Sequence, residues 1–87
     1  MTNINIYCLF ESDGALYGVY SSIKAVHRDA LKICNTGISG VYIKHPDGMQ
    51  KPTLTLLRNM FKGEMDVKVK YLSDKTQATI LKTGLKE

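Results

Sequence analysis

Two short runs of mainly hydrophobic residues lie near the start of the chain, at residues 5–11 and 15–20. Both are rich in Ile, Tyr, Leu, Phe and Val, and Ser12-Asp13-Gly14 separates them. An Asp-Gly pair between two such runs is typical of a β-hairpin. Alternate residues of a strand point the same way, so we expect the wholly apolar face of the first stretch to lie on the core. That face consists of Ile4, Ile6, Cys8 and Phe10, and the mixed set Asn5, Tyr7, Leu9 and Glu11 should face away.

The spacing of apolar residues then changes from two to about three and a half, which predicts a helix from about Ser22 to Asn35. Ser21-Ser22 supplies an N-cap hydroxyl, and Gly37 suits the left-handed position that follows a helix. One face of this helix is apolar and the opposite face carries three bases at i, i+4 and i+8. The apolar residues are Ile23, Val26, Ala30 and Ile33, and the bases are Lys24, Arg28 and Lys32.

The second half of the chain predicts two more strands, a second helix and a tail with two interpretations. Residues 38–44 form a β-branched strand that stops at the turn His45-Pro46-Asp47-Gly48. After Pro52, Thr53 can cap a helix that ends at Gly63. Residues 66–72 alternate as a strand with one wet face, and residues 74–85 fit either a strand paired with it, which we favour, or a capped helix. The second helix places Leu54, Leu57, Met60 and Phe61 on one side.

These elements predict one α+β domain over residues 1–87. Its sheet should be antiparallel or mixed, with four or five strands and both helices packed on one face. A chain of 87 residues buries a small core, so a homodimer that buries further apolar surface is an additional expectation.

Positive charge is concentrated in the middle of the chain. The net charge is +4 and the pI is about 9.1. Residues 1–23 contain no Lys or Arg, whereas residues 24–62 contain seven bases against only Asp29 and Asp47. This asymmetry favours an acidic partner, either a nucleic acid or an acidic protein surface.

An enzyme is not expected from the residues available. His27 and His45 are the only histidines, and neither has a Cys, Asp or Glu at the spacing of a metal site. The glycines occur singly and form no phosphate-binding loop. We therefore expect no catalytic residues, no metal and no cofactor. Cys8 and Cys34 should be free buried thiols. No apolar run approaches the ~18 residues that span a bilayer, and the N-terminus has no leader-like pattern, so we expect a cytosolic protein without membrane contact.

The bases and tyrosines together favour RNA binding. Lys and Arg neutralise phosphates without reading sequence, and an aromatic side chain can stack on an unpaired base. Two alternatives remain open: the bases can be spread for solubility alone, and the strand tyrosines Tyr17, Tyr20 and Tyr42 can be half-buried packing. The candidate RNA-binding residues are Lys24, Arg28, Lys32, Lys44, Arg58, Lys62, Lys68 and Lys70.

The segment from Tyr7 to Ser22 (YCLFESDGALYGVYSS), followed by a helix that opens Ile23-Lys24-Ala25-Val26, resembles the start of many small proteins of tailed bacteriophages. Such proteins are similar to the early host-takeover and counter-defence factors of T-even-like phages. The resemblance implies a non-catalytic factor in the host cytoplasm that binds a host protein or RNA, for example an RNA-binding inhibitor of a toxin–antitoxin system. A module that occludes an acidic host protein, or a virion assembly component, are the alternatives.

Overall fold

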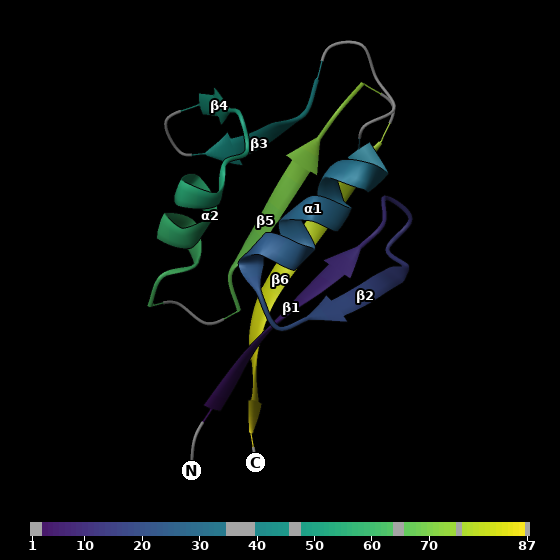
Figure 1. Cartoon of the computed structure of the whole chain (residues 1–87). Coiled ribbons are helices and arrows are strands. Elements are labelled where there is room, and N and C mark those ends of the chain that lie inside the picture. The colour runs from purple at the N-terminus through teal and green to yellow at the C-terminus, as the bar shows by residue number, and fades with distance from the viewer. Residues whose placement is uncertain (1–2, 35–39, 46–47, 64–65, 75, 87) are drawn as a thin grey trace.

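The computed structural model describes residues 3–34, 40–45, 48–63, 66–74 and 76–86, and no side chains for residues 3, 4, 85 and 86. The described chain forms one six-stranded antiparallel sheet in the order β2-β1-β6-β5-β3-β4. Both helices lie on the same side of this sheet (Figure 1). The elements are β1 (Asn3–Phe10), β2 (Leu16–Tyr20), α1 (Ile23–Cys34), β3 (Tyr42–His45), β4 (Gly48–Gln50), α2 (Leu54–Phe61), β5 (Lys68–Leu72) and β6 (Gln77–Lys86).

The α+β class and the two helices are confirmed, but the expected strand number is too low. β4 was not predicted because a strand of three residues is too short to show a hydrophobic period. The tail is a strand, as favoured, and pairs with β5 on one side and with β1 on the other. The expected Asn35 and Gly37 helix end, residues 38–39 of the third strand, and Pro46 and Asp47 of the turn lie outside the described residues.

Local capping determines where the described helix ends fall. The Ser22 hydroxyl accepts a hydrogen bond from the Ala25 amide (3.2 Å), and the Thr53 hydroxyl accepts one from the Leu56 amide (3.1 Å). These bonds satisfy amides that have no partner within the helix, as the sequence predicted. Gly63, with φ +73°, follows the end of α2 in the left-handed conformation that suits glycine.

The expected core face of β1 is wrong. Tyr7 and Leu9 are buried, whereas Cys8 and Phe10 are only half-buried on the opposite face. The helices cover the Tyr7 side, where the Tyr7 ring meets the Phe61 ring edge-on at 5.4 Å between centroids. Asn5 and Glu11 misled the prediction: Glu11 lies beyond the strand, and Asn5 lies in a part of β1 that projects past the helices (Figure 1). Polar residues at such positions do not indicate which face is buried.

The core lies between the helices and the Tyr7 face of the sheet. On that face β5 contributes Val69 and Tyr71, and β6 contributes Ala78 and Ile80, all at most 1% exposed. The other half of the core comes from Val26, Ala30 and Cys34 on α1 and from Leu57 and Phe61 on α2. Of the two cysteines, Cys34 is buried as expected and Cys8 is half-buried, and both are free thiols. Neither described helix is long and apolar enough to cross a membrane.

Candidate nucleic-acid interface

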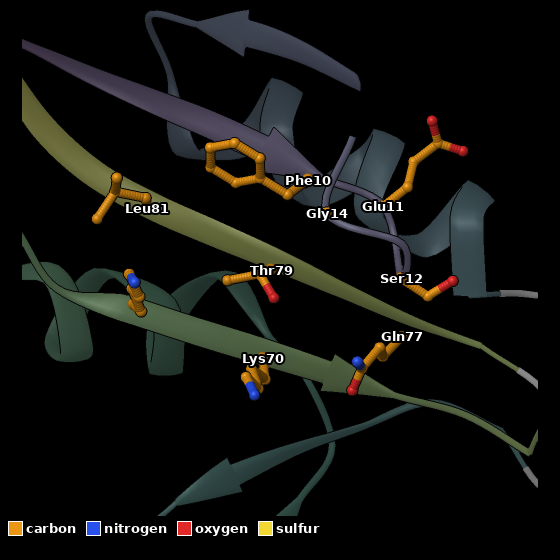
Figure 2. A pocket seen from close by; sticks show the side chains of 9 residues that line it. Phe10, Glu11, Ser12, Gly14, Lys70, Gln77, Thr79 and Leu81 are labelled. Carbon is orange, nitrogen blue, oxygen red and sulfur yellow. The ribbon is translucent and has the colours of Figure 1, made fainter. Parts of the chain in front are cut away.

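The face of the sheet that points away from the helices is not covered by any described element. Directly paired residues of neighbouring strands share a face, so the register identifies its members. Figure 2 looks onto this face, with the helices behind the sheet. We call it the open sheet face, and its residues are Ile6, Cys8, Phe10, Leu16, Val19, Tyr42, Lys44, Met49, Lys68, Lys70, Leu72, Gln77, Thr79, Leu81 and Thr83.

Two rows of side chains cross the middle of the open sheet face from β1 to β5. In one row Phe10 is paired with Thr79, and Thr79 is paired with Lys70. In the neighbouring row Leu81 lies between Cys8 and Lys68. Each row therefore begins with an apolar side chain and ends with a lysine two strands away, a separation of about 10 Å.

A hollow of about 320 Å³ lies over these rows. Phe10 and Leu81 supply its apolar surface, and Thr79, Gln77 and Ser12 supply polar groups (Figure 2). Lys68 and Lys70 line it as well. Glu11 is the acid in its lining, and its carboxylate points away from Lys70 (Figure 2). The hollow thus offers an apolar surface, hydrogen-bonding groups and two cations close together.

The lysines of this face are available to an external anion. Lys44, Lys68 and Lys70 are exposed, and none of them has an ion pair with a carboxylate in the described part of the chain. The acid beside them along the chain, Asp66, accepts a hydrogen bond from the Thr83 hydroxyl at 3.4 Å. Lys68 and Lys70 lie on the same face of β5 and repel each other, and a bound anion would reduce this repulsion.

The bases of α1 lie on the other side of the molecule. Lys24, Arg28 and Lys32 are exposed on the outer surface of α1, beyond the helix layer. Arg28 Nε and Lys32 Nζ lie 3.1 Å and 3.6 Å from one carboxylate oxygen of Asp29. Asp29 therefore partly neutralises the positive charge of this surface.

Asp29 stays ionised because of its neighbours. The Tyr20 hydroxyl donates to Asp29 Oδ2 at 2.7 Å. This bond first, and the Arg28 bond second, lower the pKa of Asp29. Burial and the same hydrogen bond raise the pKa of Tyr20 to about 12. The Tyr20 hydroxyl therefore links β2 to α1 and is not free to serve an RNA site.

The eight candidate bases lie on two different surfaces. Lys44, Lys68 and Lys70 share the open sheet face, whereas Arg58 and Lys62 lie on or just after α2, on the helix side with the α1 bases. They are separated because a helix that covers one sheet face must point its polar side away from the other face. Spacing along a chain cannot bring bases on opposite layers together.

Phe10, Thr79 and Leu81 were missed as site residues. The sequence predicts Phe10 in the core, and for the tail it favours a strand with a capped helix as the alternative. The available signal was the period of the tail itself: Gln77, Thr79 and Leu81 alternate with Ala78, Ile80 and Lys82. Of the three tyrosines considered, Tyr42 is half-buried on the open sheet face.

In the described residues no three His, Cys, Asp or Glu side chains gather closely enough to hold a metal ion. Comparison with protein-family models, with curated proteins and with solved structures gives no match. The resemblance to small phage proteins therefore stays a prediction, and the chemistry of the open sheet face has to carry the functional argument.

Proposed function

We propose that the protein binds single-stranded RNA on the open sheet face and acts without catalysis. The observation that supports this most directly is the hollow that joins Phe10 and Leu81 to the unpaired cations Lys68 and Lys70. A sheet whose exposed aromatic residues stack on splayed bases is a recurrent way to bind RNA.

Each part of the site has a counterpart in a nucleotide. The apolar surface of Phe10 and Leu81 fits the flat face of a base, and stacking on an aromatic ring contributes about 1–3 kcal/mol per base. The Thr79 hydroxyl and the Gln77 amide can donate to and accept from base edges. Lys68, Lys70 and, farther along the sheet, Lys44 can neutralise successive phosphates.

In the cell, this protein would act by occupying an RNA that another factor needs. That is the mode of action of a non-catalytic inhibitor or counter-defence factor, the class that the hairpin resemblance implies, including inhibitors of toxin–antitoxin systems. A phage origin and action in the host cytoplasm belong to the same proposal.

Two charge-reversal triples test which surface binds. One variant changes Lys44, Lys68 and Lys70 to Glu, and its matched control changes Lys24, Arg28 and Lys32 to Glu; all six residues are exposed. Affinity for a labelled single-stranded RNA of about 12 nucleotides is measured by fluorescence anisotropy at several salt concentrations. The sheet triple should weaken binding at least about tenfold. It should also reduce the slope of log affinity against log salt concentration by about two units, because each lost phosphate contact contributes ~0.7. The helix triple should change affinity much less.

Loss of binding in the helix triple with retention in the sheet triple would contradict the proposal. So would binding of the matching DNA strand as tightly as RNA, because the assignment is to RNA. A pull-down whose partner survives nuclease treatment would replace RNA with a directly bound host protein. Thermal unfolding of both triples checks that each variant is folded.

A further inference from the structure

Strand β2 presents an apolar, uncharged edge to solvent. Four large hydrophobic side chains in the described residues are exposed, and three of them lie on β2: Leu16 (56%), Tyr17 (47%) and Val19 (55%). The strand sequence LYGVY contains no charge and no proline. β2 pairs with β1 on one side, and Figure 1 shows it at the margin of the molecule. Among the described strands, none therefore pairs with its outer backbone N–H and C=O groups.

β4, at the opposite edge of the sheet, has features that disfavour pairing with a strand of another chain. β4 is only three residues long, and Lys51 and Pro52 follow it directly. Short length, charge and proline are the devices that keep edge strands from pairing with other chains. β2 has neither a charge nor a proline and is longer than β4, although its register with β1 shifts between Leu9 and Phe10. An edge without charge or proline is open to pairing with another strand.

We propose that β2 pairs with β2 of a second copy of this chain, antiparallel about a two-fold axis centred on Gly18. Under such an axis an antiparallel strand can pair with itself. Each N–H that faces the second copy meets a C=O of that copy, and the axis repeats the same bond in the opposite direction. A heterologous partner would need a separate matching strand. Gly18 at the centre places Tyr17 opposite Val19 of the second copy, and Leu16 opposite Tyr20.

Charge also favours this arrangement. Antiparallel pairing brings the hairpin turn of one copy toward the start of α1 in the other. The turn is acidic, with Glu11 and Asp13, whereas the first turn of α1 has no acid and carries Lys24. Acidic groups are also favoured near a helix N-terminus. The two turns lie at opposite ends of the pair, so like charges are kept apart.

The pairing would extend the sheet across both copies and leave the two open sheet faces on the same side. Because each strand contributes only five residues, the interface is small and the dimer should be weak. This inference does not depend on RNA binding.

Sedimentation equilibrium over a wide range of protein concentration tests the proposal with two matched double variants. The first combines Tyr17→Lys with Val19→Lys, which places new lysines directly opposite each other at two positions of the pair. The second combines Tyr17→Glu with Val19→Lys, which places opposite charges at the same two positions. Like charges directly opposite destabilise strand pairing and opposite charges support it.

The native chain should change from 9.7 kDa toward twice that mass as concentration rises. The Lys/Lys variant should dimerise at least tenfold more weakly, and the Glu/Lys variant should dimerise about as well as the native chain. Amide exchange of residues 16–20 should slow as protein concentration rises in the native chain and in the Glu/Lys variant, but not in the Lys/Lys variant. A native chain that stays monomeric, a Lys/Lys variant that dimerises normally, or a Glu/Lys variant that fails to dimerise would each overturn the proposal. Circular dichroism confirms that both variants fold.

Discussion

At the scale of a single residue, Lys82 is a charged side chain that belongs to the core. It is only 6% exposed, on the same sheet face as Tyr7, which is its direct partner on β1. Its Nζ donates a 2.5 Å hydrogen bond to the carbonyl oxygen of Phe61, the last residue of α2. Carbonyls in the last turn have no partner within a helix and form its negative end. Lys82 therefore both caps α2 and joins it to β6.

Replacing Lys82 with Met keeps most of the buried stem and removes the donor. The Phe61 carbonyl then loses its hydrogen bond in a buried place, and the free energy of unfolding should fall by about 1–3 kcal/mol. Urea denaturation measures this change. Lys70→Met on the exposed face is the control and should alter stability by less than about 0.5 kcal/mol. Equal stability of the two variants would show that the Lys82 contact contributes nothing.

At the scale of elements, α1 is joined to β5 by a polar contact within the core layer. His27 Nδ1 and the Tyr71 hydroxyl lie 2.6 Å apart in a hydrogen bond. Burial lowers the pKa of His27 from 6.5, and burial raises the pKa of Tyr71. Both groups are therefore held in their neutral forms where the helix meets the sheet.

This contact should make the stability of the protein depend on pH. Below about pH 6.5 the unfolded chain binds a proton at His27 before the folded chain does, so the free energy of unfolding falls as pH decreases. The slope is at most about 1.4 kcal/mol per pH unit and levels off below the folded pKa. Thermal unfolding between pH 5 and pH 8 measures it. His27→Gln cannot titrate and should show a shallower decline. The lowered pKa of Asp29 places its own effect below pH 3.8, outside this window.

At the scale of the whole molecule, the sheet is supported unevenly along its length. Residues 77–81 of β6 pair with β5, whereas residues 83–86 pair only with residues 3–6 of β1. This two-stranded part projects past the helices (Figure 1), and in it Asn3 pairs with Lys86. An isolated pair of strands is marginally stable in water.

Hydrogen exchange should therefore divide β6 into two parts. The amides of residues 79–81, which lie in the three-stranded region under the helices, should open only with global unfolding. Those of residues 84–86 should exchange at least about 100-fold faster, because the projecting ribbon can fray locally. Residue-resolved exchange by NMR measures both. Uniform protection along β6 would mean that the ribbon is as stable as the core.

Much of the local structure could be predicted because it depends on neighbours in the chain. Asp13 and Gly14 specify the hairpin turn: the Asp13 side chain accepts from the Ala15 amide at 2.9 Å, and Gly14 has φ +88°. Ser22 and Thr53 start the helices for the same reason. The sequence could not predict which candidate bases lie together: Lys44, Lys68 and Lys70 are on the open sheet face, and the five others are on the helix side.

The sequence by itself determined both helices, every strand but β4, the helix N-caps and the exposed character of the eight candidate bases, because these depend on periodicity and on groups a few residues apart. The tertiary structure alone decided which face of β1 is buried, since Ile6, Cys8 and Phe10 are as apolar as Tyr7 and Leu9. That choice follows from where α1 and α2 pack, and two helices cover only one side of a sheet. The uncovered side became the open sheet face, which separated the lysines of the strands from the bases of the helices.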